Sequence, residues 1–63
     1  MRLEGKLGHG RTALTGRPHW FSGWTVELAG GGGRLGRYGT LELARQAMLA
    51  WGVAWVEEWS PIN

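Results

Sequence analysis

The chain has 63 residues, a formal net charge of +2, five tryptophans and no cysteine. Its length suits one small domain over residues 1–63, and the lack of cysteine excludes disulfides and thiolate metal sites. No apolar run approaches the roughly 18 residues that cross a bilayer, and the first residues lack the apolar core of a signal peptide. We therefore expect a cytoplasmic protein without a membrane partner.

The composition is unusual in its tryptophan content and in the predominance of arginine among the cationic residues. Each tryptophan side chain can bury roughly 200 Å², so we expect the five to supply much of the core of a domain that has no disulfide. Six of the seven cationic residues are arginine, which suits planar contacts with phosphate or carboxylate. The tryptophans are Trp20, Trp24, Trp51, Trp55 and Trp59.

Residues 5–12, GKLGHGRT, are one substitution away from the phosphate-binding loop G-x-x-x-x-G-K-[ST], with Arg11 in place of its lysine. Such a loop needs a buried strand before it and a helix after it. Only the residues MRLE precede this motif, and Gly16 and Pro18 oppose a helix downstream. We therefore expect no nucleotide site, and interpret residues 1–18 as a basic, glycine-rich arm or a short hairpin.

Residues 19–28, HWFSGWTVEL, alternate as a half-buried strand does. The four glycines at residues 30–33 predict a flexible hairpin loop, and residues 34–38, RLGRY, predict the partner strand. At least one arginine of this second strand should face solvent. The side chains that we expect to face inward from the first strand are Trp20, Trp24, Val26 and Leu28.

A helix is predicted from Leu41 to Trp51. Thr40 suits the N-cap, Glu42 complements the helix dipole, and Gly52 suits a left-handed C-terminal position. Glu42, Arg45 and Gln46 would form its wet face. The expected buried stripe consists of Leu41, Ala44, Ala47, Met48 and Trp51, widened by Leu43 and Ala50.

Residues 53–59, VAWVEEW, predict a last strand that ends before Pro61. The resulting order, β-β-α-β, indicates an α+β fold for the core at residues 19–60. In this fold one helix packs on a small three-stranded, mainly antiparallel sheet. The N-terminal hairpin, if formed, would precede that core.

Residues 24–51 contain an aromatic-led strand, a basic strand that ends in Tyr-x-Thr, and a helix that begins Leu-Glu-x-Ala-Arg. This pattern resembles the three-stranded-sheet-plus-helix DNA-binding domains of phage integrase arms and of some plant transcription factors. The resemblance implies DNA contact through sheet arginines and an aromatic side chain, here Arg34, Arg37 and Trp24. The chain departs from that pattern in the tryptophan-rich strand after its helix. In size and composition it is also similar to small accessory proteins of phages and mobile elements, such as anti-CRISPR proteins.

No catalytic group of residues is recognisable in the sequence. His9 and His19 lie in glycine- or proline-rich segments, and the chain has no aspartate to orient them. A metal site at these histidines would still need a third ligand. Adjacent strand residues point to opposite faces, so Glu57 and Glu58 cannot converge on one substrate. We expect a protein that is not an enzyme and that has no cofactor.

Basic and aromatic residues form the candidate binding site. Arginine beside aromatic rings suits stacking on nucleic-acid bases and contact with phosphates. The same residue types are enriched at protein–protein hot spots. A third interpretation is that the aromatic rings are core and the arginines only solubilise the rim. The candidate residues are Arg17, Trp20, Phe21, Arg34, Arg37, Tyr38 and Trp59.

A single helix covers only one face of a sheet, so Phe21, or Val56 with Ala54, or Trp55 with Trp59, should stay partly exposed. Exposed apolar patches on a small protein mark an interface. We therefore expect a small binding protein that docks on a host protein or nucleoprotein complex, as an inhibitor carried by a phage or mobile element would in the host cytoplasm. The alternatives are direct nucleic-acid binding through the sheet arginines and a structural subunit that forms a homodimer through its tryptophans.

Overall fold

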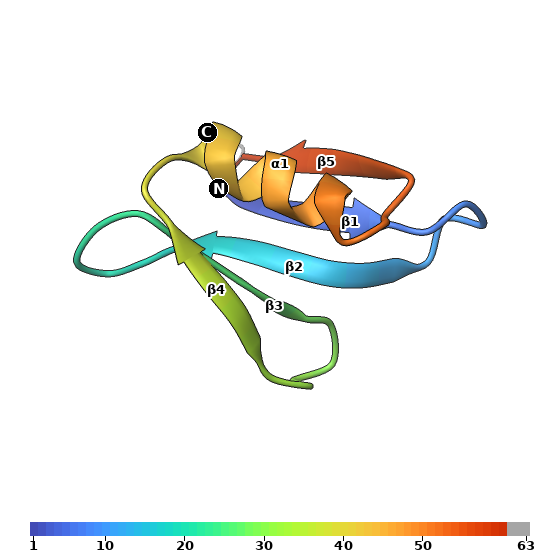
Figure 1. Ribbon diagram of the computed structural model, residues 1–63, viewed down its shortest axis with the longest axis horizontal. Helices are drawn as coiled ribbons and strands as arrows, with labels where there is room; N and C mark the ends of the chain where they lie inside the picture. The colour runs from blue at the N-terminus through green and yellow to red at the C-terminus, as the bar shows by residue number, and fades with distance from the viewer. Residues whose placement is uncertain (61–63) are drawn as a thin grey trace.

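The computed structural model describes residues 1–60 and shows a small α+β fold in which one helix packs against an open sheet (Figure 1). All the neighbouring strands are antiparallel, and their order across the sheet is β4-β3-β2-β1-β5. The predicted stop at Pro61 lies outside the described residues. The elements are β1 (Arg2–Lys6), β2 (Thr12–Pro18), β3 (Trp24–Leu28), β4 (Arg34–Tyr38), α1 (Leu41–Ala50) and β5 (Trp55–Trp59).

The sheet has five strands where the sequence predicts three, because residues 2–18 form a hairpin whose two strands lie in the sheet. This hairpin separates β3 from β5, so the two ends of the expected core do not pair with each other. Gly5 and Gly16, which weaken the strand pattern of this segment in the sequence, both lie inside its strands and are buried. The N-terminal segment is therefore the centre of the sheet and not an arm beside it.

The two buried glycines lie beneath Met48 of α1. A Cβ at Gly5 would come within 3.1 Å of Met48 Cε and 3.1 Å of Val53 Cγ1, and a Cβ at Gly16 within 3.6 Å of Met48 Sδ. Each glycine pairs across the strands with a buried leucine: Gly5 with Leu14, and Gly16 with Leu3. The leucines flank the methionine while the glycines make room for it. This packing brings α1 close to the middle of the sheet.

The core between α1 and the sheet is aliphatic. Within residues 1–60 no tryptophan is fully buried, so the expectation that these side chains supply the core is wrong. Trp24 is half-buried against the core, and the other four are exposed. The close approach of α1 to glycines leaves a thin layer that small and medium side chains fill. The buried apolar residues are Leu3, Leu14, Val26, Ala44, Met48 and Val53.

The helix begins at Leu41 as predicted and ends at Ala50, one residue before the predicted end at Trp51. The Thr40 hydroxyl oxygen accepts a hydrogen bond from the Leu43 N–H at 3.1 Å, which caps the first turn. Gly52 follows the helix with a φ of 105°, a left-handed conformation that favours glycine. The buried stripe is narrower than predicted, because Leu43, Ala50 and Trp51 are exposed. In the described part of the chain, no helix is long and apolar enough to cross a membrane.

Gly5→Ala tests whether the packing of Met48 against the sheet requires a residue without a Cβ at position 5. The added Cβ would meet Val53 Cγ1 at 3.1 Å and Leu14 Cβ at 3.2 Å, neither of which is the end of a flexible side chain. We expect overpacking to lower the free energy of unfolding by about 1–3 kcal/mol, measured by urea denaturation. Gly8→Ala is the control, since nothing lies within 4 Å of its added Cβ. Equal denaturation midpoints for the two variants would contradict this packing.

Candidate functional site

The face of the sheet that points away from α1 carries polar and charged side chains in rows that run across the strands. Alternate residues of a strand point to the same face, and the register aligns them from one strand to the next. On β4, a register shift opposite Glu27 brings Arg34 into line with that glutamate, three residues from Arg37. One row, here called the arginine row, contains three arginines and no carboxylate. It consists of Arg37 on β4, Thr25 on β3, Arg17 on β2, Arg2 on β1 and Trp59 on β5.

A second row lies beside the arginine row and carries the acidic side chains of this face. We call it the carboxylate row, and it holds three glutamates and one arginine. On β1, β2, β3 and β5 the members of the two rows are two residues apart, so each carboxylate lies two residues from a residue of the arginine row. The carboxylate row consists of Arg34 on β4, Glu27 on β3, Thr15 on β2, Glu4 on β1 and Glu57 on β5.

Ion pairs join the two rows. Arg2 Nε lies 3.0 Å from Glu4 Oε2, and Arg17 Nε lies 3.3 Å from Glu27 Oε1. Glu4 also accepts from Lys6 Nζ at 2.9 Å, and its pKa is lowered chiefly by that hydrogen bond, with further contributions from Arg2. The side chains of Arg2 and Arg17 nevertheless remain 57% and 67% exposed, so these guanidinium groups are open to a partner.

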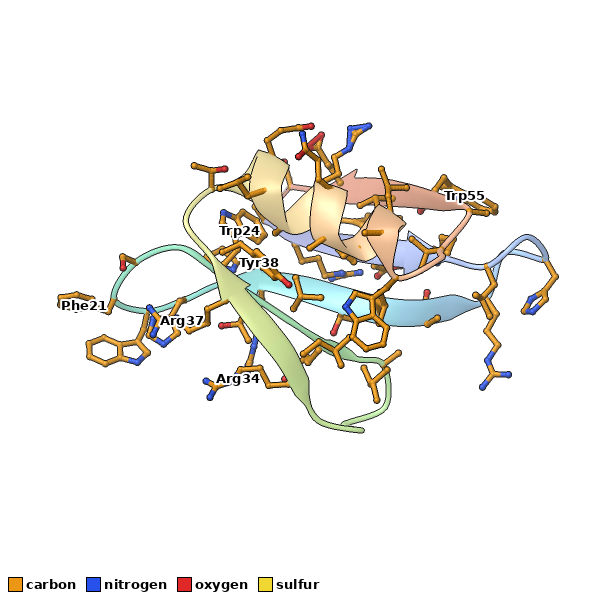
Figure 2. All side chains as sticks on the ribbon, in the orientation of Figure 1. Phe21, Trp24, Arg34, Arg37, Tyr38 and Trp55 are labelled. Carbon is orange, nitrogen blue, oxygen red and sulfur yellow. The ribbon has the colours of Figure 1, made fainter. Side chains whose placement is uncertain are left out.

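The loop at residues 19–23, here called the aromatic loop, holds Trp20 and Phe21 in solvent. Their side chains are 88% and 76% exposed, and their rings meet edge to face at 5.6 Å. The sequence predicts Trp20 on the inner face of a strand, which is wrong, because Pro18 ends β2 and β3 begins only at Trp24. The aromatic loop therefore lies beyond the ends of β2 and β3, and Figure 2 shows Phe21 projecting away from the sheet.

Hydrogen bonds fix the conformation of the aromatic loop. The His19 N–H donates to the Gly23 carbonyl at 2.8 Å, and the Phe21 N–H donates to His19 Nδ1 at 3.2 Å. Arg37 Nη2 donates to the Ser22 carbonyl at 3.3 Å and so ties the loop to β4. Gly23 has a φ of 75°, and a Cβ there would lie 2.5 Å from the Tyr38 carbonyl oxygen. Only glycine fits this position, and the loop presents its rings already ordered.

A cavity of about 560 Å³ lies where the aromatic loop meets the uncovered face. Its wall combines two guanidinium groups, an imidazole and an indole, which suits an anionic or planar ligand group. Glu27 is the one carboxylate of this wall, and it already pairs with Arg17. The residues that line the cavity include Arg17, His19, Trp20, Thr25, Glu27 and Arg34.

Five of the seven candidate residues come together around the aromatic loop and β4. Figure 2 shows Phe21, Arg37 and Arg34 at one end of the molecule. The cavity places Trp20 beside Arg17 and Arg34.

The two other candidates lie apart from this cluster. Tyr38 pairs with Trp24 on the side that α1 covers and packs against the core. Trp59 lies on the opposite edge of the uncovered face, where the Arg2 guanidinium carbon is 5.3 Å from its ring centroid.

His19, Thr25 and Arg2 also belong to this surface, although they are not among the residues predicted from the sequence. The contact of His19 with Trp20, at 5.6 Å between ring centroids, follows from their adjacency in the loop. The place of Arg2 depends on the pairing of β1 with β2 and β5, which no local signal reveals. The alternatives for exposure are resolved: Phe21 is exposed, and so are Trp55 and Trp59, while Val56 packs against the core.

The pKa of His19 is lowered from its ordinary value of 6.5. The main cause is the partial removal of its ring from water, and the positive charges of Arg37, Arg34 and Arg17 add to it. A neutral ring can accept the hydrogen bond from Phe21 N–H at Nδ1. At neutral pH His19 therefore supports the aromatic loop as an uncharged acceptor.

No family model, curated protein or solved structure matches this chain. The proposals below therefore rest on the residues and geometry of this chain alone.

The titration of His19 provides a test of the electrostatics of this surface. We expect an NMR titration of its imidazole to give a pKa below 6.5, and Arg34→Gln to raise that pKa toward the ordinary value. Because the folded state binds this proton more weakly than the unfolded chain, the stability that a neutral His19 contributes is complete above pH 6.5 and is lost as pH falls from 6.5 through the folded pKa. Arg11→Gln, in the β1–β2 turn, is the control and should leave the pKa unchanged. A pKa at or above 6.5 in the parent would contradict the assignment.

Proposed function

We propose that this chain is a non-enzymatic binding protein that docks on a larger protein or nucleoprotein through the aromatic loop and the arginines beside it. The observation that carries the proposal is the exposure of Trp20 and Phe21, at 88% and 76%, on a loop held by its own hydrogen bonds. Large aromatic side chains that stay in water while the fold is complete are available to a partner. An ordered loop also loses little conformational entropy on binding.

The two aromatic rings of the loop do not supply enough binding free energy by themselves. At about 25 cal/mol per Å², two rings that bury about 150–250 Å² each contribute about 7–12 kcal/mol. Association costs about 4–15 kcal/mol in lost rotational and translational freedom. The rings alone thus leave little net affinity. We infer that Arg17, Arg34 and Arg37 complete the docking surface, because arginine beside aromatic rings is the usual composition of a binding hot spot.

The mode of action that we propose follows from size. A protein of 63 residues that occupies a surface of a larger host protein or nucleoprotein blocks that surface for other partners. This is the action of an inhibitor carried by a phage or mobile element. Direct steric occupation requires no catalytic group and no cofactor.

Truncation of the aromatic loop tests the proposal. Trp20→Ala and Phe21→Ala should each weaken capture of the partner by about 30-fold, since a hot-spot residue contributes about 2 kcal/mol or more and 1.4 kcal/mol is a factor of ten. Capture is quantified with immobilised protein and lysate of the host cell, with and without nuclease. Trp51→Ala is the control, because Trp51 is 59% exposed but lies at the end of α1, outside the loop. Capture that survives both loop substitutions would contradict the proposal.

A further inference from the structure

We propose that the arginine row binds a segment of single-stranded nucleic acid, with the phosphates along the arginines and unpaired bases on Trp20, beside the β2–β3 part of the row, and on Trp59, at its β5 end. The inference rests on the proposed function, because it names what the docked partner presents beside the aromatic loop. Three features support it: the charge of the arginine row, the length of that row, and the positions of the aromatic rings near it.

The arginine row has the charge that a phosphate backbone requires. It contains three guanidinium groups and no carboxylate, whereas the glutamates of this face lie in the neighbouring row. Phosphates that strayed onto the carboxylate row would meet Glu27, Glu4 and Glu57. The charges of the two rows therefore favour the arginine row as the track of an anionic chain across the strands.

The cations of this track are accessible. Among residues 1–60, Arg37 makes no ion pair and is fixed by its hydrogen bond to the Ser22 carbonyl. Arg17 and Arg2 are paired with glutamates, but both are more than half exposed, and such pairs contribute little to stability. A phosphate can take the place of the carboxylate or join it at the free guanidinium N–H groups.

The length of the track fits a short strand. Neighbouring strands of a sheet are about 4.8 Å apart, so the row from β4 to β5 spans about 19 Å. Single-strand sites of this kind begin at about four nucleotides. Thr25 lies between Arg37 and Arg17 and is 5% exposed, so it adds no charge and the side chains around it form the surface of the track there.

Aromatic rings lie at one end of the track and beside its middle. Trp20 lines the cavity together with Arg17, and Trp59 closes the row on β5 with its ring against Arg2. Bases stack on such rings only when they are free of a complementary strand, because duplex bases are already stacked on each other. This arrangement favours a single strand over a duplex, which would engage the arginines alone.

The test measures binding of fluorescent oligothymidylate of 12 nucleotides by anisotropy, beside a 12-base-pair duplex. We expect the single strand to bind at least tenfold more tightly, with log affinity falling against log salt with a slope of about −2, since each of three phosphates contributes about 0.7. Trp59→Ala should weaken the single strand at least fivefold and leave the duplex within twofold.

Matched charge variants identify the track. Arg37→Gln and Arg17→Gln should each weaken oligothymidylate at least fivefold and reduce the salt slope by about 0.7. Arg11→Gln removes the same charge from the exposed β1–β2 turn, outside the row, and should stay within twofold of the parent. Circular dichroism verifies that every variant is folded, and a row variant that unfolds is replaced by Arg2→Gln.

Three results would overturn the inference: no binding of oligothymidylate, equal effects of the Arg37→Gln and Arg11→Gln variants, or a duplex that binds as tightly as the single strand. The proposed function is tested apart from it, in nuclease-treated lysate with the loop variants. Capture that depends on Trp20 without oligothymidylate binding leaves the docking function standing and refutes the nucleic-acid track. Loss of both refutes both.

Discussion

Met48 packs directly on the backbone of the sheet, because the strand residues beneath it carry no Cβ. The rest of the structure depends on this contact. Gly5 and Gly16 leave a hollow that Leu3 and Leu14 flank on neighbouring strands. Because the methionine fills that hollow, α1 lies close to the sheet, and one layer of aliphatic side chains completes the core. The bulky aromatic residues are thereby left outside, where they are available for binding.

The same contact decides which face of the sheet is free. Because α1 covers one face of the sheet, the side chains on the other face point toward solvent. These side chains make up the arginine and carboxylate rows. Exposed ion pairs stabilise a fold weakly. The charges of this face therefore contribute less to folding than the core does, and they are free to serve a partner.

The outer edge of β5 bears on the idea of a homodimer through tryptophans. Trp55 and Trp59 are 39% and 46% exposed on this strand, but Glu57 lies between them and its carboxylate accepts from Trp55 Nε1 at 3.0 Å. A two-fold strand pairing centred on Glu57 would set two carboxylates directly opposite each other, which is destabilising. Charged residues on an edge strand oppose such pairing in many sheets, so this edge is poorly suited to strand pairing between two copies.

The sequence by itself determined the features that depend on near neighbours: the cap at Thr40, the period of the helix, the glycine loop at residues 30–33 and the strand pattern around Val26. Only the tertiary structure decided that residues 2–18 form the centre of the sheet, because Gly5 and Gly16 weaken a strand locally and become favourable only beneath Met48. It also decided which charges share a row. Arg37 and Arg17 come together through the register of three strands, and a slip of one residue would turn one of them to the opposite face.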